Sequence, residues 1–423
     1  MAHDVLFTVS APGRPVAERA APTGAPEAIS RNVPVGRMVG VDLARGLAVL
    51  GMYAAHVGPD PEIGGFRGWL MELAQGRSSA LFAFLAGLSI VLLTGRRTPA
   101  TGRAGRQAVV RVVIRAVVLV ALGTALTMLG TSIEVILAYY GVCFLLVLPL
   151  YRLRPAALAA IAAGSVLVLP QVLFVVQRSI DQGSWAEAVT RHDPLAHVGG
   201  TDGVIGLMFT GDYPVLAWVP FLIAGMAVAR LDLRSAAVRA RLAMAGGALA
   251  LVGYGGSWLA LHLIPGVVPG ISMFGQDAVR GGARSAWWSD AAGFPSGDGD
   301  SASWLWAASP HSETTLSVIA GTGVALLVLV VCTDAVARWR AVRRVAMPVI
   351  AVGSMPLTVY VLHILVVKAL GLDLGDLPGP PMAVLLAFAV AAMLLAVVWS
   401  SFFRRGPLEY ALHGATRISR YVA

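Results

Sequence analysis

Charged residues are scarce in this chain. Asp, Glu, Lys and Arg make up 13% of its 423 residues, whereas soluble domains contain roughly 25%. The hydrophobic share is 57% and the mean hydropathy is +0.75. These values exclude a soluble enzyme. Since one membrane crossing needs about 20 apolar residues, the length fits one polytopic bundle better than two or three soluble domains.

Cysteine and lysine are almost absent as well. The two cysteines, Cys143 and Cys332, lie within apolar runs, and their spacing indicates neither a metal site nor a redox pair. We expect both to pack in the core. Lys368 is the single lysine, so arginine carries nearly all of the basic charge. The net charge is +9, but no basic run is interleaved with aromatic residues, so no nucleic-acid partner is indicated.

The chain divides by composition into a bundle and two tails. Residues 1–37 are rich in Ala, Pro and charge and contain no apolar stretch of the kind found in a secretory signal. We expect a disordered cytoplasmic tail there. Residues 38–403 carry the apolar runs, and residues 404–423 form a basic cytoplasmic tail.

Ten apolar runs are long enough to cross a bilayer. They predict an all-α polytopic bundle of about ten transmembrane helices. The sixth run is long and contains Gly211–Pro214, which predicts a short interfacial helix before a span that begins at Pro214. The runs are 38–57, 78–95, 107–129, 132–151, 155–177, 204–230, 238–263, 313–335, 345–370 and 380–403.

The arginines between these runs predict the orientation, because cytoplasmic loops carry an excess of Lys and Arg. Arginine-rich segments alternate with arginine-poor ones along the chain. We therefore expect both termini on the cytoplasmic side of a multi-pass protein of the cytoplasmic (inner) membrane. The arginine-rich segments are the N-terminal tail, 96–111, 152–154, 230–241, 338–344 and 404–420.

Ionisable residues inside a span are costly and mark function by default. Asp42, Arg45 and His56 share one face of the first run by their three-and-four spacing. Arg45 and His56 are eleven residues apart, which places them within about 20° on the helix and roughly 16 Å apart along its axis. Arg45 suits phosphate recognition and His56 suits proton abstraction. Alternatively, Arg45 snorkels to the headgroups beside Asp42, and His56 caps the helix end.

Two further histidines are candidates. His311 and Glu313 open the eighth run; the simpler interpretation is a helix start that Ser312 caps and that Glu313 favours through the helix dipole. His363 lies deeper in the ninth run, three residues after Tyr360, and lines a cavity or packs in the core.

Six short motifs occur in an order that resembles a known family. The chain is similar, over about residues 37–415, to bacterial membrane proteins of the heparan-alpha-glucosaminide N-acetyltransferase catalytic-domain family, with a C-terminal half like the YeiB-type proteins. The motifs are VDLARGLAVLGM at Val41–Met52, GRSSALFAFLAG at Gly76–Gly87, GDYP at Gly211–Pro214, Pro310–His311, MPLT at Met355–Thr358 and GPLE at Gly406–Glu409.

The resemblance implies an acyltransferase of the cell envelope. Relatives move acyl groups, often acetyl, from cytoplasmic acyl-CoA to an acceptor on the opposite face. In related O-antigen-modifying enzymes an Arg and a His with ten residues between them serve the donor and catalysis, and Arg45 and His56 match that spacing. The glycosaminoglycan-modifying enzyme uses a His in the following loop, whereas this chain has none between Val57 and Gly76. His56 is then the nearest candidate.

This resemblance suggests a mechanism. Acetyl-CoA or another acyl-CoA enters from the cytoplasm, where Arg45 and the basic loop with Arg96, Arg97 and Arg103 meet its phosphates. His56 is the general base on a hydroxyl or amine of a glycan, a lipid-linked sugar or a small molecule. Direct transfer and an acyl-His56 intermediate both stay open. No metal is implied. The candidate donors to the oxyanion are Arg77, Ser78, Tyr360 and His363.

Two other functions fit the same buried charges. A transporter of a lipid or small metabolite would use them as a proton or substrate relay. A membrane partner protein without catalytic activity would bind neither donor nor product. The relay residues would be Asp42, Arg45, Glu134, Asp334 and His363.

Overall fold

The computed structural model describes residues 38–96, 98–198, 203–268, 282–290, 302–372 and 379–422. Every regular element within these ranges is helical, which confirms the all-α class. The tail expected at residues 1–37 and the candidate Arg97 lie outside the described residues.

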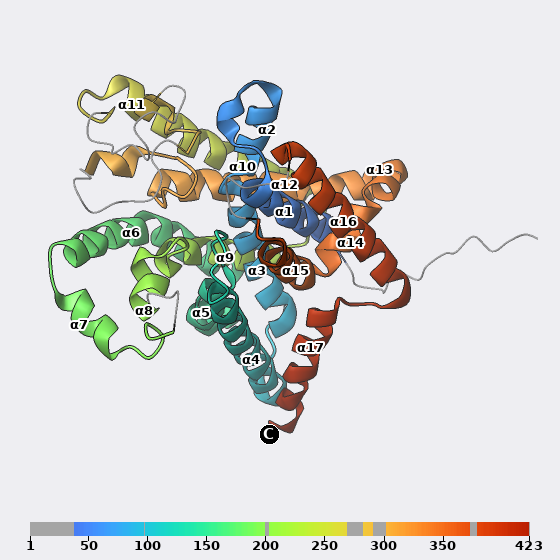
Figure 1. The fold of residues 1–423 in the computed structure, drawn as a ribbon. Coiled ribbons are helices and arrows are strands. Elements are labelled where there is room, and N and C mark those ends of the chain that lie inside the picture. The colour runs from blue at the N-terminus through green and yellow to red at the C-terminus, as the bar shows by residue number, and fades with distance from the viewer. Residues whose placement is uncertain are drawn as a thin grey trace, which may run out of the picture. The chain divides into compact units, whose positions relative to one another are not determined.

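The elements follow each other in the order drawn in Figure 1. The α-helices are α1 Val39–Val57, α2 Gly65–Ala74, α3 Arg77–Thr94, α4 Gly102–Thr127, α5 Leu137–Val147, α6 Pro155–Asp181, α7 Trp185–His192, α8 Gly203–Ile205, α9 Val215–Ala229, α10 Ala236–Ala250, α11 Gly256–Leu263, α12 Thr315–Arg338, α13 Arg340–Val345, α14 Met347–Ser354, α15 Pro356–Leu370, α16 Pro381–Phe402 and α17 Pro407–Ala415. Short 3₁₀ or π segments are η1 Pro61–Ile63, η2 Leu148–Arg152, η3 Gly206–Thr210, η4 Leu251–Gly255, η6 Gly282–Ser285, η7 Ala302–Trp306 and η8 Thr416–Tyr421.

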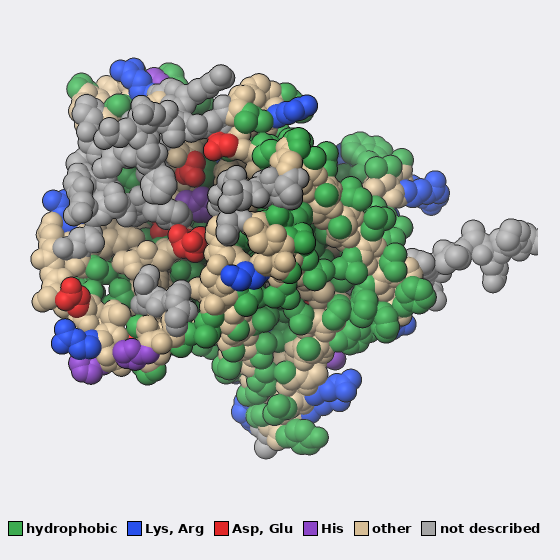
Figure 2. All heavy atoms as spheres, viewed as in Figure 1, with side chains coloured by type: hydrophobic (Ala, Val, Ile, Leu, Met, Phe, Trp, Pro, Cys, Tyr) green, Lys and Arg blue, Asp and Glu red, His purple; other side chains and the backbone are tan. Residues whose placement is uncertain are grey.

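The helices differ in how far they are buried. In the apolar stretch that runs through α2 and α3, 67% of the residues are buried, and in that of α12, 56% are buried. In the apolar stretches of α4, α6, α10 with α11, and α16, at most 28% of the residues are buried. Large apolar side chains are exposed on each of these helices, as Figure 2 shows for the region of α16, so their outer faces suit lipid. α1 packs against α3, α12, α14 and α16 (Figure 1). The interior of the bundle is thus built around α1, α3 and α12.

The structure bears out a multi-pass membrane protein. Six helical stretches are long and apolar enough to cross a bilayer, and two bent pairs raise this number to eight if each pair is one span. The run expected at 38–57 forms α1, which carries Asp42 and Arg45, and the run at 132–151 forms the short α5 with η2. Ten spans and the orientation of the termini therefore stay predictions.

Two of the expected spans are bent. Gly203–Thr210 and α9 meet at 61°, with Pro214 before α9, as the sequence of the sixth run predicts. The run at 345–370, expected to be one span, is broken by a bend of 89° between α14 and α15. The reason is local: Pro356 disfavours helical backbone at the preceding residue, and Met355 has φ −138° and ψ 51°.

The break at Met355 is preceded by a very close approach of two helices. A Cβ atom added at Gly353 would lie 1.7 Å from the carbonyl oxygen of Asp42, and one added at Gly46 would lie 2.1 Å from that of Val349. Both residues must be glycine for α14 to lie directly on α1. This contact places α15 against the far end of α1.

The C-terminal segment is folded. α17 and η8 pack on α4, and α17 also contacts α15. The basic tail expected after residue 403 is therefore helical over Pro407–Tyr421 and forms part of the same compact unit.

Candidate active site

Two histidines from distant parts of the sequence meet at the end of α1. His56 Nδ1 lies 3.0 Å from His363 Nε2, and the two rings are stacked with centroids 5.2 Å apart. His363 is 2% exposed, whereas His56 is only partly buried. The sequence identified both residues as candidates but not as a pair.

The hydrogen bonds of this pair assign the protons. His363 Nδ1 contacts the carbonyl oxygen of Tyr360, and since a carbonyl only accepts, Nδ1 carries the proton. Nε2 of neutral His363 must then accept the hydrogen bond from His56 Nδ1. Neutral His56 is left with its lone pair on Nε2. This is the protonation state that a general base requires.

Tyr53 holds α1 and α15 together beside the histidines. Its hydroxyl donates to the carbonyl oxygen of Val359 over 2.8 Å, and its ring lies 4.6 Å from that of His363 between centroids. Tyr53 is one helical turn before His56 and is 2% exposed. The Tyr53 bond fixes α15 against α1, and the contact with His363 of α15 then orients the His56 ring.

Asp42 and Arg45 lie nearer the start of the same helix. Arg45 Nη1 donates to Asp42 Oδ1 over 3.2 Å and to the carbonyl oxygen of Gly353, and Nη2 donates to Ser89 Oγ over 3.1 Å. Arg45 and His56 both contact the α14–α15 segment, in keeping with one shared face of α1. The Arg45 guanidinium thus joins α1, α3 and α14, while its role toward a donor stays a prediction.

A second cluster surrounds Arg77 at the start of α3. Its Nε donates to the Tyr254 hydroxyl and its Nη2 to the carbonyl oxygen of Trp288, both over 2.8 Å. Nη1 donates to the carbonyl oxygen of Glu72, and the guanidinium stacks 3.8 Å from the Trp288 ring. Because these contacts occupy most of its donors, Arg77 fits the positioning of loops better than the binding of an oxyanion.

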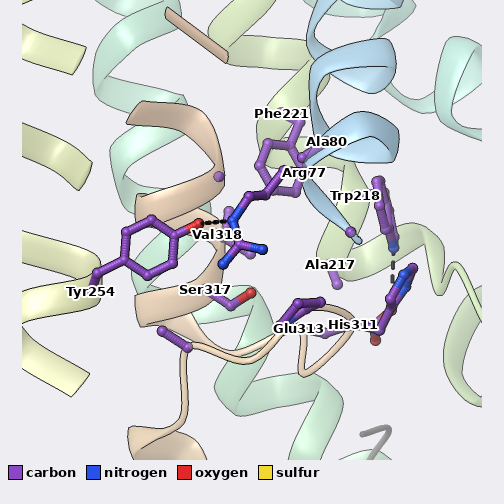
Figure 3. A pocket seen from close by; sticks show the side chains of 14 residues that line it. Arg77, Ala80, Ala217, Trp218, Phe221, Tyr254, His311, Glu313, Ser317 and Val318 are labelled. Carbon is purple, nitrogen blue, oxygen red and sulfur yellow. Dashed lines mark hydrogen bonds between the residues drawn. The ribbon is translucent and has the colours of Figure 1, made fainter. Parts of the chain in front are cut away.

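His311 and Glu313 line a small cavity of about 40 Å³ next to Arg77 (Figure 3). Both residues have φ of 59°, a left-handed conformation that is costly outside glycine and collects at functional sites. His311 also lies within electrostatic reach of His56. The loop that carries them is therefore near His56.

Burial controls the charge of this loop. It raises the pKa of the Glu313 carboxyl well above its usual range, and a hydrogen bond of 3.2 Å from Trp218 Nε1 to Oε1 opposes the shift. It also lowers the pKa of His311, against the nearby Asp290 and Asp212. Glu313 Oε2 has no hydrogen-bond partner among the described residues. Burial thus favours the neutral forms of both the carboxyl and the imidazole that line the cavity.

The expected cap of the following helix is wrong. Thr314, rather than Ser312, caps α12 and accepts from the backbone N–H of Ser317 over 3.1 Å. Ser312 donates its hydroxyl hydrogen to the carbonyl oxygen of Ser309. Glu313 turns toward Trp218, so its carboxyl does not serve the first turn of the helix.

The raised pKa gives a prediction for Glu313→Gln. A folded-state pKa above the unfolded value means that the native state binds an extra proton between the two, so the free energy of unfolding falls as pH rises through that window. Glutamine keeps the acceptor for Trp218 and does not ionise. We expect the variant to melt at least as high as the wild type at pH 8, with a flatter dependence of Tm on pH from 5 to 8. Parallel Tm profiles of the two proteins would contradict this.

Two family models match successive parts of the chain. Residues 37–264 match the family model described as heparan-alpha-glucosaminide N-acetyltransferase, catalytic, which is more than half of the chain. The chain belongs to this family. Residues 285–419 match a second model, described as a protein of unknown function (DUF418). A search of curated proteins finds no match. The resemblance of both halves is confirmed, and the family supports a membrane acetyltransferase-type function.

The candidate site joins the two matched regions. His56 and Arg77 belong to the N-acetyltransferase catalytic region, whereas His311, Glu313 and His363 belong to the DUF418 region. The His56–His363 contact crosses between them. The candidate site therefore contains residues from both matched regions.

The remaining candidates lie elsewhere. Ser78 is buried next to Gly51 of α1, and the Tyr360 hydroxyl accepts from the backbone N–H of Ile136 over 3.3 Å. Arg96 contacts Met38, and Arg103 is exposed and donates to the carbonyl oxygen of Val422. The structure brings neither arginine to the histidine pair.

The residues of the relay expected of a transporter take part in separate contacts and cavities in the part of the molecule that is described. Asp334 pairs with Arg239 and Arg338, far in sequence from the Asp42–Arg45 pair. Glu134 lines a different cavity, of about 260 Å³, beside Asp212. Within the described ranges, no group of three or more His, Cys, Asp or Glu side chains could hold a metal ion.

Proposed function

We propose that this protein is an integral membrane acyltransferase that moves an acyl group, such as acetyl, from cytoplasmic acyl-CoA to a hydroxyl or amine. The acceptor is extracytoplasmic or lipid-linked, such as a glycan. The family match supports acetyl transfer. The observation that carries the proposal is the hydrogen-bond chain from the Tyr360 carbonyl through His363 to His56. It leaves a basic nitrogen at the end of α1.

In the proposed reaction His56 Nε2 takes the proton of the acceptor hydroxyl or amine. The acceptor oxygen or nitrogen then attacks the thioester carbonyl carbon, the new acyl bond forms and the carbon–sulfur bond breaks. The CoA thiolate leaves and receives the proton from His56, so CoA and the acylated acceptor are the products. His363 is a positioning residue, because it fixes the tautomer and the plane of His56.

The attack also builds negative charge on the thioester oxygen, which requires a preorganised donor. We assign this role to Glu313, a lining residue of the cavity whose Oε2 is buried without a partner among the described residues and whose neutral form is favoured by burial. A neutral carboxylic acid can donate such a hydrogen bond at pH 7. Arg77 positions the surrounding loops instead.

The proposal is tested with purified protein in proteoliposomes and acetyl-CoA labelled in its acetyl group. Glucosamine and hydroxylamine serve as probe acceptors, and free thiol and labelled product are measured against protein-free liposomes. Thiol release matched by acetylated probe supports the acyltransferase. Thiol release at the protein-free rate with every acceptor overturns it. Label that accumulates inside the vesicles without thiol release assigns the protein to transport instead.

A further inference from the structure

A large basic cavity lies at the opposite end of α4 from its junction with α5. It measures about 550 Å³, and α4, α17 and η8 line most of it. Arginines provide its main charge: Arg111, Arg115, Arg405, Arg417 and Arg420. Figure 2 shows Lys and Arg side chains at the end of the molecule that Figure 1 labels with α17 and the C-terminus. The volume of this cavity lies within the range of small-molecule sites, roughly 300–1,000 Å³.

Two segments far apart in sequence form this cavity. On α4, Gln107, Arg111 and Arg115 recur at a spacing of four residues and therefore line one face over roughly 12 Å. The C-terminal segment folds back on this face, where the carbonyl oxygen of Val422 accepts from Gln107 Nε2 over 3.3 Å. The sequence alone showed only scattered arginines at the ends of predicted spans.

The positive charge of the cavity is largely uncompensated by its own lining. Glu409 is the one carboxylate among the lining residues. Arg115 Nε is buried and has no hydrogen-bond partner in the described part of the chain. The same arginines act on His413. Burial is the largest cause that lowers the pKa of its imidazole, and Arg405, Arg417 and other nearby arginines lower it further. A buried guanidinium nitrogen without a hydrogen-bond partner is costly unless a ligand such as an anion accepts from it.

Glu409 is committed to another helix. Its Oε1 accepts from the backbone N–H groups of Leu357 and Thr358 over 2.8 and 3.2 Å, and its Oε2 accepts from the Thr358 hydroxyl. These donors are at the N-terminus of α15, where a carboxylate is favoured by the helix dipole. The five arginines are therefore left to face a ligand.

We propose that this cavity binds the phosphate-bearing nucleotide end of the acyl donor. The assignment rests on the proposed function, because that function supplies the donor. A 3′-phosphorylated nucleoside diphosphate carries a charge of roughly −4, taking the terminal phosphate as about −2, and five guanidiniums offset by one carboxylate match it. Planar guanidiniums also bind phosphate oxygens in pairs. The phosphates thus meet Arg111, Arg115 and the C-terminal arginines, whereas the sequence indicated Arg45 and the loop at Arg96.

Helix α15 connects the lining of the cavity with the histidine pair. Ser354, at the break before α15, lines the cavity, and Glu409 binds the first turn of that helix. His363 lies five residues after Thr358, or roughly 7.5 Å along the axis. An arm that continues from the nucleotide would thus run beside α15 toward His56. The geometry connects a phosphate site on one side with the proposed base on the other.

The test measures binding of adenosine 3′,5′-bisphosphate and of CoA to the full chain in nanodiscs of uncharged lipid. The exposed residues Arg417 and Arg420 allow substitutions that spare the fold, and Arg343→Ala on exposed α13 is the matched control. We expect Arg417→Ala and Arg111→Ala each to weaken binding of both probes by about tenfold or more, as for the loss of a charge-assisted hydrogen bond. Added salt should weaken wild-type binding further.

Other results would overturn the assignment. Equal affinities in Arg417→Glu, Arg111→Ala, Arg343→Ala and wild type, all with wild-type Tm, would exclude the cavity. If neither probe binds but anionic phosphatidylglycerol is retained by the wild type and lost by Arg417→Glu, the cavity is a lipid headgroup site. Turnover decides the proposed function separately: probe binding at this cavity without acyl transfer would refute the acyltransferase and leave the nucleotide site in place.

Discussion

Replacement of His56 by alanine should lower the rate of CoA release by about 10²–10⁴-fold, the usual contribution of a general base. The variant should melt at the wild-type temperature, because His56 is only partly buried and packs at a helix end. Binding of adenosine 3′,5′-bisphosphate should also be unchanged, since its proposed site is lined by other residues. Thiol release, Tm and probe affinity measured on one preparation check the three expectations together.

His363 should behave differently because it acts through His56. His363→Leu removes the acceptor for His56 Nδ1 and leaves the base free to rotate. We expect a smaller loss of kcat than in His56→Ala, together with a shifted pH profile of kcat, whereas His363→Gln, which keeps an acceptor, should recover part of the rate. Exposed His192 provides the control, and His192→Ala should match the wild type.

A folded His56→Ala protein with the wild-type rate of CoA release would contradict the proposed mechanism.

The spacing of polar residues in α1 was enough to predict its functional face. Asp42, Arg45 and His56 fall on one side because helical periodicity is local, and the structure places Arg45 and His56 against the α14–α15 segment. The contact with His363 could not be predicted, because it joins residues 307 positions apart. That contact depends on the close packing of Gly46 and Gly353 and on the break before Pro356.

The basic cavity could not be predicted from the apolar runs of the sequence. Arg111 and Arg115 lie on one face of α4 by their spacing alone, but the sequence interpretation did not include either of them among the candidate site residues. Their significance depends on α17 and η8 folding back onto α4. The sequence predicted the basic character of this C-terminal segment but not its helical structure. Motif order, by contrast, was sufficient to place the chain in its family.

Arg45→Ala should destabilise the protein by about 3–5 kcal/mol, the usual cost of removing one member of a buried ion pair. The side chains of Arg45 and Asp42 are 17% and 11% exposed, so solvent screens the pair only weakly. The variant also loses the hydrogen bonds to Ser89 and to the Gly353 carbonyl, which join α1 to α3 and α14. Thermal unfolding in detergent, compared with Arg343→Ala, measures the loss. An unchanged Tm would show that the pair is not structural.

The double variant Arg45→Met with Asp42→Leu separates stability from donor recognition. Replacing both charges by apolar side chains of similar size is often neutral or stabilising, so this protein should recover most of the lost Tm. If Arg45 binds a donor phosphate, as its spacing from His56 indicated, the double variant folds but loses affinity for CoA. If the phosphates bind at Arg111 and the C-terminal arginines, affinity for CoA and for adenosine 3′,5′-bisphosphate stays within about twofold of wild type, far less than the roughly tenfold effect of one lost charged hydrogen bond. We expect the second result, because the guanidinium of Arg45 already bridges three helices.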